Sequence, residues 1–315
     1  MQLVNPARPS SPSSPISNPS WETSALSWEY HKAANPNLPD VPIRAFPASL
    51  HQTGTTAIVP LDLSADLETP YLATTSNLLA NYIEIAPGDT LRSHAISSSE
   101  VFYVMRGSGS TETEFGTIQW TAGDSFTLPA NGGATHWAAE DSALYWVHDA
   151  PMLAYLGVQP SAPRFKPAFY SGEYLQGEIN RIREEGIRRK LNRNGIILGN
   201  PDSAETRTVT HTMWSLYNLV PPHSAQKPHR HNSVALDLGV FAQGNTYTLI
   251  GDRLDDDGNI INPVKMMWET HGVFVTPPGL WHSHHNESDE DAFVFPVQDA
   301  GMQTYMRTLD IQFAK

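Results

Sequence analysis

Two stretches of the chain consist of short runs of alternating apolar and polar residues, most of which end in Gly, Pro or Asp. The first stretch begins near Asn81 and contains NYIEIAPGD, EVFYVMRGSG and GTIQWTAGDSFTLP. The second begins near Thr212 and contains SVALDLGVFA, TYTLIGD and GVFVTPP. Several short strands at regular spacing are typical of β-sandwiches and β-barrels. The pattern therefore predicts an all-β protein with two barrels.

The segments outside these stretches have a different character. The best helical candidate runs from Tyr174 to Asn192, and its mixed charges and few apolar residues favour a solvated linker helix. A length of 315 residues suits two domains, each with its own core. The predicted organisation is, in chain order, a disordered Ser- and Pro-rich tail (1–20), an extended N-terminal arm (21–80), a first barrel (81–159), a partly helical linker (160–211) and a second barrel (212–315).

The composition narrows the kinds of ligand that the chain can bind. Its 33 Asp and Glu outnumber its 20 Lys and Arg, and the resulting formal charge of -13 argues against binding to nucleic acid or to a membrane surface. No run of about 18 apolar residues and no apolar signal-like start is present, so a cytoplasmic location is expected. The chain has no cysteine and 13 histidines. A metal would therefore be held by nitrogen and oxygen ligands.

Three histidines of the second barrel stand at positions that favour a metal site. In the segment PHRH, side chains two apart on a strand share one face, so His229 and His231 project together and Arg230 points away. Later in the chain, the turn PPG ends one strand and His282 opens the next. If these two hairpins lie side by side, three neutral imidazoles converge. Such a set leaves about three octahedral positions of a divalent metal open to substrate and dioxygen.

These motifs resemble those of the cupin superfamily. The segment Gly272–Asn286 matches the second cupin motif, and PHRHNSVAL supplies the His-x-His of the first motif without the glutamate that usually follows. A three-histidine set of this kind is similar to that of the gentisate and salicylate 1,2-dioxygenases, bicupin enzymes that cleave aromatic rings beside a hydroxyl group with non-haem Fe(II). The resemblance implies two double-stranded β-helix barrels. It also implies His229, His231 and His282 as ligands and His284 as an acid–base or substrate-contacting residue.

One departure from that family bears on the substrate. The ring-cleaving enzymes carry an arginine after the Ala-Leu pair, where it can grip a carboxylate, whereas this chain has Asp237. Because an aspartate repels a carboxylate, Asp237 indicates a substrate without a carboxylate there, or one with a cationic group. Trp281 is the other candidate substrate contact, with core packing as the favoured interpretation. Arg92, Lys227 and Arg230 are candidates for a positive partner.

The first barrel carries a degenerate version of the same motifs. The segment GDTLRSHAISSSE fits the first motif except that Ile96 replaces the second histidine, and His136 follows two residues later than the second motif expects. His94, Glu100 and His136 form a possible second metal set, since two histidines and one carboxylate suit Fe(II). The alternative, favoured by the apolar bulk of Ile96, is a metal-free cup kept for packing and dimerisation. In the ring-cleaving enzymes, by contrast, the first cup usually bears the metal.

Three functions are compatible with this site. The leading hypothesis is an Fe(II)-dependent dioxygenase in which a hydroxylated aromatic or related small molecule chelates the metal, dioxygen binds beside it and His284 donates a proton. The second is a redox-neutral isomerase, lyase or decarboxylase that uses Mn, Ni or Zn. The third is a non-catalytic protein that binds a metal or a small molecule. A dependence on oxygen distinguishes the first from the others. The resemblance also implies a homodimer or homotetramer.

Overall fold

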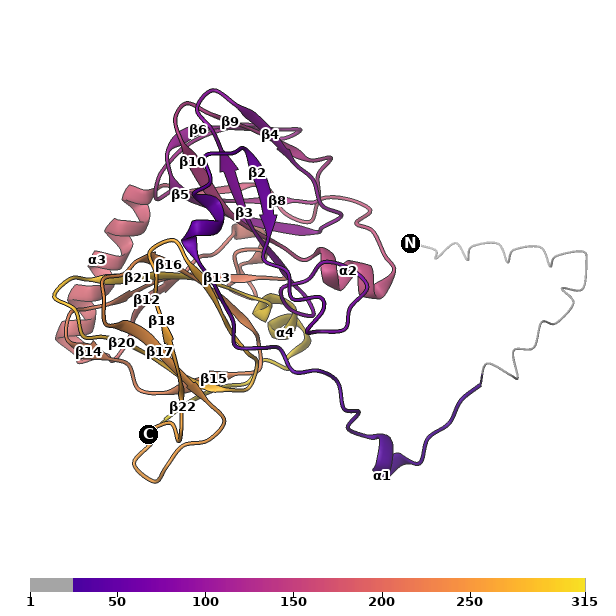
Figure 1. Ribbon diagram of the computed structural model, residues 1–315, viewed down its shortest axis with the longest axis vertical. Coiled ribbons are helices and arrows are strands. Elements are labelled where there is room, and N and C mark those ends of the chain that lie inside the picture. The colour runs from indigo at the N-terminus through magenta and orange to yellow at the C-terminus, as the bar shows by residue number, and fades with distance from the viewer. Residues whose placement is uncertain (1–24, 315) are drawn as a thin grey trace, which may run out of the picture. The chain divides into compact units, whose positions relative to one another are not determined.

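A computed structural model describes residues 25–314 (Figure 1). The predicted tail, residues 1–20, lies outside the described residues. The chain divides into two units, residues 1–38 and residues 39–315. In the first unit, the described part contains helix α1 (Tyr30–Ala33), and the Glu29 carboxylate caps it by accepting two backbone N–H hydrogen bonds. Within the described range, no helix has the length and apolar character needed to cross a membrane.

The first barrel consists of two antiparallel sheets of the second unit. A six-stranded sheet has the order β11-β8-β5-β10-β3-β2, and a four-stranded sheet has the order β4-β9-β6-β7. The strands are β2 (Ala57–Pro60), β3 (Leu79–Ile85), β4 (Thr90–Ser93), β5 (Ser99–Arg106), β6 (Ser108–Thr113), β7 (Gly116–Thr121), β8 (Ser125–Pro129), β9 (Ala134–Ala138), β10 (Ser142–His148) and β11 (Ala168–Tyr170).

The second barrel repeats this plan. Its six-stranded sheet has the order β1-β19-β16-β21-β13-β12, and its other sheet has the order β18-β17-β20-β15-β22, with β14 beside β20. The strands are β1 (Ala45–Phe46), β12 (Asn194–Ile197), β13 (Trp214–Val220), β14 (Ser224–Ala225), β15 (His229–His231), β16 (Ala235–Phe241), β17 (Thr246–Gly251), β18 (Val264–Met267), β19 (Val273–Thr276), β20 (Trp281–Asn286), β21 (Ala292–Gln298) and β22 (Ile311–Phe313).

The expected arm and linker each add one strand to each barrel. From the arm, β1 pairs with β19 of the second barrel and β2 pairs with β3 of the first. From the linker, β11 pairs with β8 of the first barrel and β12 pairs with β13 of the second. Strand pairing therefore extends beyond the ranges 81–159 and 212–315 that the sequence indicated, because each barrel recruits edge strands from the segments around it.

The linker also contains the longest helix, α3 (Gly172–Arg189), close to the expected range from Tyr174 to Asn192. Most of its side chains are exposed or partly exposed, as expected of a solvated helix, but Leu175 and Ile179 are buried in the main apolar core. These two side chains lie one turn apart and form a narrow apolar stripe that the surrounding charges obscure in the sequence. The remaining short helices are η2 (Ala48–His51), α2 (Ala150–Leu156), η3 (Pro201–Ser203) and α4 (Ala300–Met306).

The six-stranded sheets of the two barrels share one apolar core. Side chains alternate along β5, so Val101 and Tyr103 join the shared core while Phe102 and Val104 fill the inside of the first barrel. Across the interface, the ring centroids of Tyr103 and Phe295 are 4.8 Å apart. Because β5 is buried on both faces, its sequence is apolar almost throughout instead of alternating.

The interiors of the two barrels are filled differently. Large apolar side chains, including Phe102, Phe126, Trp120 and Trp146, pack the inside of the first barrel. The second barrel has a smaller apolar cluster around Trp268. It also contains a cavity of about 300 Å³. Aromatic side chains thus fill the interior of the first barrel at these positions, whereas the cavity of the second barrel can receive a ligand.

Candidate metal centre

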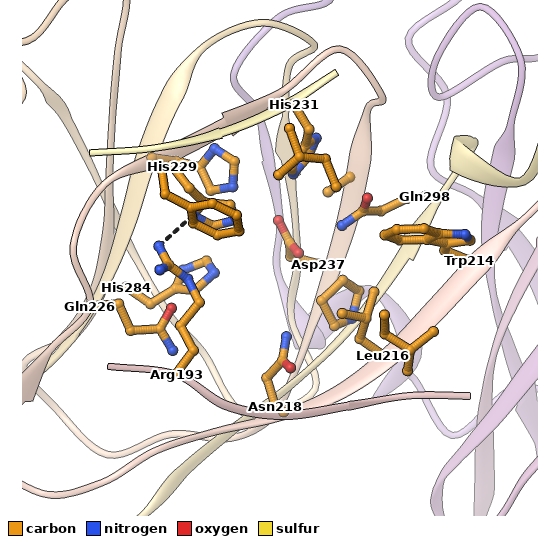
Figure 2. A pocket seen from close by; sticks show the side chains of 17 residues that line it. Arg193, Trp214, Leu216, Asn218, Gln226, His229, His231, Asp237, His284 and Gln298 are labelled. Atoms are coloured by element: carbon orange, nitrogen blue, oxygen red, sulfur yellow. Dashed lines mark hydrogen bonds between the residues drawn. The ribbon is translucent and has the colours of Figure 1, made fainter. Parts of the chain in front are cut away.

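Four histidines line the cavity of the second barrel, and Figure 2 labels three of them, His229, His231 and His284. His229, His231 and His282 form the candidate metal site. His229 and His231 come from β15 and His282 comes from β20, and the antiparallel register places His229 directly opposite His282. The candidate ligand atoms of the three side chains all lie within 4.8 Å of one another. Among residues 25–314, this is the single group of His, Asp and Glu side chains close enough to hold a metal ion. The structure thus brings the three predicted ligands together.

The turn before His282 is tied to the first motif. Gly279 has a φ of +79°, a left-handed conformation that glycine adopts without the steric penalty of a side chain. Its backbone N–H donates to the carbonyl of His231 at 2.7 Å. This hydrogen bond fixes the start of β20 against the end of β15, and so fixes His282 relative to the other two histidines.

Two of the three rings are held in the tautomer that metal ligation requires. Nδ1 of His231 lies 2.8 Å from the carbonyl oxygen of Ser233, and Nδ1 of His282 lies 3.1 Å from that of Leu280. Because a carbonyl can only accept, each Nδ1 carries the hydrogen and each Nε2 keeps its lone pair. Nε2 of His231 is buried and has no hydrogen-bond partner among the described residues. A buried acceptor without a partner is destabilising, and a divalent cation would supply the missing interaction.

Burial keeps the histidines of this cavity neutral. It lowers the pKa of His229 to about 2, with a smaller contribution from the positive charge of Arg193, and it lowers the pKa of His284 to about 3. The pKa values of His231 and His282 are also lowered, mainly by burial. Neutral imidazoles can ligate a metal at neutral pH without first losing a proton.

Arg193 lines the same cavity, and sequence reasoning missed it. It directly precedes β12, and its Nη2 donates to Nδ1 of His229 at 3.0 Å (Figure 2). Nη2 also donates to the carbonyl of Lys227. Burial lowers the pKa of Arg193 to about 10, which leaves the guanidinium charged at neutral pH. Arg92 and Arg230, considered from the sequence as positive partners, are not among the residues that line the cavity. Arg193 lies in a segment of the linker with many charged residues, and no sequence motif distinguishes it from them.

We expect Arg193→Gln to raise the affinity for a divalent metal by about three- to tenfold. The guanidinium adds a like charge beside the metal site, and its hydrogen bond keeps Nδ1 of His229 an acceptor, which places the ring hydrogen on Nε2 where a metal would bind. Titration of Ni²⁺ against a chromophoric chelator measures the change. Arg230→Gln is the matched control, since Arg230 lies between two of the ligands in sequence but faces Trp281. Weaker binding by Arg193→Gln would show instead that the guanidinium supports the ligands.

His284 is fixed in the opposite tautomer. Nε1 of Trp268 donates to Oγ1 of Thr248 at 2.7 Å, and the same hydroxyl lies 2.8 Å from Nδ1 of His284. Among the described residues this buried hydroxyl has no other acceptor for its own hydrogen, so the hydrogen points to Nδ1 of His284 and Nε2 of His284 carries the ring hydrogen. His284 lines the cavity but lies outside the three-histidine group. It can therefore donate a hydrogen bond to a ligand in the cavity.

The first barrel contains the same Trp–Thr–His arrangement. Nε1 of Trp120 donates to Oγ1 of Thr111 at 2.9 Å, and that hydroxyl lies 2.8 Å from Nδ1 of His136. His136 therefore corresponds to His284 and not to a metal ligand. This correspondence explains why His136 follows two residues later than the cupin motif expects.

The strand register identifies the residues that occupy the ligand positions of the first barrel. In the second barrel His229 pairs with His282, and in the first Ser93 pairs with Ala134, two residues before the histidine of the Trp–Thr–His arrangement. Ser93 and Ala134 thus stand where the second barrel has two of its ligands. Ala95, two residues after Ser93, occupies the position of His231, the third ligand of the second barrel. None of these three side chains is a metal ligand of the kind found in the second barrel.

The possible second metal set, His94, Glu100 and His136, is not brought together. The three do not form a group with ligand atoms within 4.8 Å. His94 is exposed, whereas Ser93 directly before it is buried. Glu100 is buried and accepts three side-chain hydrogen bonds, and both ring nitrogens of His136 have hydroxyl partners. A shift of one residue moves a side chain to the other face, so the motif alone misplaced the set.

Of the two predicted substrate contacts, Asp237 lines the cavity and Trp281 does not. Asp237 lies on β16 and is buried, and one of its carboxylate oxygens accepts from Oγ1 of Thr276 at 2.7 Å. Burial raises the pKa of Asp237 to about 7, against the opposing effect of that hydrogen bond. Trp281 directly precedes His282 on β20 and so points to the other face, where the Arg230 guanidinium lies 5.3 Å from its ring centroid.

The rest of the cavity is mostly apolar with a few amides. A small cavity with apolar walls and a few convergent polar groups suits a small molecule that carries a few polar substituents. Its apolar lining comprises Ile197, Trp214, Leu216, Ala235, Pro296, Ile311 and Phe313, and its amides are Asn218, Gln226 and Gln298.

No family model matches the chain. A 5-aminosalicylate 1,2-dioxygenase from Comamonas sp is 30% identical over 94 residues, which cover 29% of this chain and 22% of that protein. A gentisate 1,2 dioxygenase 1 from Aquipseudomonas alcaligenes is 25% identical over 120 residues, which cover 38% and 31%. The H2HPP isomerase of Bacillus subtilis is 24% identical over 83 residues, which cover 26% and 30%. Each match spans less than a third of the curated relative's length.

Solved structures resemble the chain over most of its length. A salicylate 1,2-dioxygenase from Pseudaminobacter salicylatoxidans has a TM-score of 0.69 at 13% identity, covering 89% of this chain and 90% of that one. A mutant oxalate decarboxylase of Bacillus subtilis has a TM-score of 0.53 at 14% identity, covering 84% and 77%. The chain is therefore a two-barrel protein with the bicupin fold, which confirms the fold class predicted from the sequence. The fold is that of the salicylate 1,2-dioxygenase structures, the resemblance that the histidine motifs indicated.

Proposed function

We propose that this bicupin is a non-haem Fe(II)-dependent dioxygenase that oxidatively cleaves a hydroxylated aromatic or related small molecule. The proposal is carried by the convergence of His229, His231 and His282 in the cavity, with a buried Nε2 of His231 that lacks a partner among the described residues. The aromatic-ring dioxygenases among the matched proteins and the shared fold support it.

The roles of the chain's own residues follow from their positions. Bound Fe(II) would supply the redox chemistry that joins substrate to dioxygen. His229, His231 and His282 would hold the ion and, being neutral, would leave its charge available to an ionised substrate hydroxyl. The apolar walls would exclude water, and Nε2–H of His284 would donate a hydrogen bond to a ligand oxygen.

Oxygen uptake tests this proposal. We expect the Fe(II)-loaded protein to consume oxygen with a hydroxylated benzoate and His231→Ala to lose more than about 99% of that rate, because the variant lacks a ligand. His94→Ala, which removes an exposed imidazole of the first barrel, should keep it. An oxygen electrode records the rate, and elemental analysis of the same sample records the iron. Fully loaded protein that consumes no oxygen with any compound of a hydroxybenzoate and aminophenol panel would contradict the proposal.

A redox-neutral cupin reaction is the second candidate. The same three ligands bind Mn, Ni or Zn, and the matched proteins include an isomerase and a decarboxylase. Substrate turnover under nitrogen with a redox-inactive metal would favour this candidate, and a filled site without turnover would favour a binding protein. A cytoplasmic location and a homodimer or homotetramer remain predictions; a monomer in sedimentation at micromolar concentration would contradict the second.

A further inference from the structure

The cavity of the second barrel holds two residues of opposite charge in addition to its histidines. Arg193 enters from the linker, and Asp237 stands on β16. Among residues 25–314 neither side chain takes part in an ion pair. The two therefore lie apart in one cavity, each without a charged partner from the protein.

One carboxylate oxygen of Asp237 has no hydrogen-bond donor from the described chain. Its side chain is almost completely buried, and Oδ2 accepts from the Thr276 hydroxyl, whereas Oδ1 accepts from no group of the described chain. A buried carboxylate that lacks hydrogen bonds is unfavourable. A ligand that donates an N–H or O–H to Oδ1 would relieve this penalty, and a ligand that presents an anion there would increase it.

Two of the three guanidinium nitrogens of Arg193 have no hydrogen-bond acceptor in the described structure. Nη2 reaches two acceptors of the protein, but Nη1 has none in the described structure and Nε is buried without a partner. The guanidinium forms strong hydrogen bonds with carboxylates and other oxyanions. An acidic group of a ligand in the cavity would accept the hydrogen bonds that Nη1 and Nε do not donate to the protein.

We propose that Arg193 and Asp237 are the two specificity-determining residues of the cavity, and that they select a planar ligand with an acidic group and a separate hydrogen-bond-donating substituent. Arg193 meets the acidic group, and Asp237 meets an amino or hydroxyl substituent elsewhere on the same molecule. This inference rests on the proposed function and deepens it by naming the substrate class. It also reconciles Asp237 with a carboxylate-bearing substrate, because the carboxylate lies at the other residue.

Binding of two matched probes tests the inference. The probes are 2-hydroxybenzoate and 5-amino-2-hydroxybenzoate, titrated calorimetrically into the Fe(II)-loaded protein without oxygen. We expect the amino compound to bind about tenfold more tightly, because only it satisfies Oδ1 of Asp237. Asp237→Asn, which keeps an acceptor for Thr276, should reduce that ratio to less than about threefold. Arg193→Gln should weaken both probes by about tenfold or more and leave the ratio unchanged.

The controls separate this inference from the proposed function. Asp256→Asn removes an exposed carboxylate of a surface turn and should change neither affinity. Thermal unfolding and iron content, measured for every variant, show whether a loss of binding reflects a damaged fold or an empty metal site. Equal affinity of the wild type for the two probes, or an unchanged ratio in Asp237→Asn, would overturn the inference. Failure of the iron to bind would overturn the proposed function instead.

Discussion

Removal of the His282 imidazole is expected to abolish metal binding by the second barrel. Changes to residues that only support a metal ligand typically lower affinity by about 10- to 100-fold, so loss of a ligand should lower it by more than about 100-fold. His282 is also the ligand that bridges the two motifs, since it pairs with His229 on the neighbouring strand. The remaining two imidazoles belong to one short strand and cannot enclose an ion by themselves.

Metal content and thermal unfolding measure this effect together. A metal present at about 100 times its dissociation constant stabilises a folded protein by about 2.7 kcal/mol, so the wild type should unfold at a higher temperature with Fe(II) and His282→Ala should not respond. His285→Ala is the matched control, because His285 lies on the same strand and faces the Tyr247 ring instead of the ligands. A fully loaded His282→Ala protein would show that the metal is held elsewhere.

Asp237→Asn is expected to stabilise the metal-free protein at about pH 8 by up to about 4 kcal/mol. Folding raises the pKa of Asp237 from 3.8 to about 7, so the folded state binds the proton more tightly than the unfolded state does. The wild type therefore loses stability as the pH rises from about 4 to about 7, while the carboxyl group is forced to ionise in the cavity. Asparagine carries no charge and escapes this loss.

Urea unfolding in the presence of a chelator measures the difference at about pH 4, 6 and 8. The difference in the free energy of unfolding between the variant and the wild type should be close to zero at the lowest pH and should increase as the pH rises. Asp256→Asn, at an exposed carboxylate, should show no such trend. A gap of constant size would mean that Asp237 is not the group that titrates. A stability penalty at a cavity residue is typical of a side chain retained for ligand binding.

The parts of the site that depend on the alternation of side chains along a strand, or on a turn between strands, could be predicted from the sequence. His229 and His231 share a face because a strand alternates, and His282 follows a Pro-Gly turn that ends the preceding strand. The two barrels were visible in the strand-like runs for the same reason. These features depend on neighbouring residues, which a single sequence displays.

The parts that depend on long-range pairing could not be predicted. The ligand positions of the first barrel became clear only from the pairing of Ser93 with Ala134, because the sequence does not show which face His94 takes. Arg193 reaches the cavity through a strand that the linker adds to the second barrel. Trp281, a candidate substrate contact from the sequence, lies outside the cavity because the alternation that places His282 inside places Trp281 on the other face.

The apolar core that the two barrels share has a consequence for biosynthesis. The sheet face of the first barrel that carries Val101 and Tyr103 is covered by strands of the second barrel, including β21. During translation, the first barrel emerges from the ribosome long before β21 has been synthesised. This apolar face therefore stays uncovered during much of translation. Exposed apolar sheet in a nascent chain favours aggregation and recruits chaperones. Slower translation or lower temperature during expression should therefore affect the yield of this protein more than its final stability.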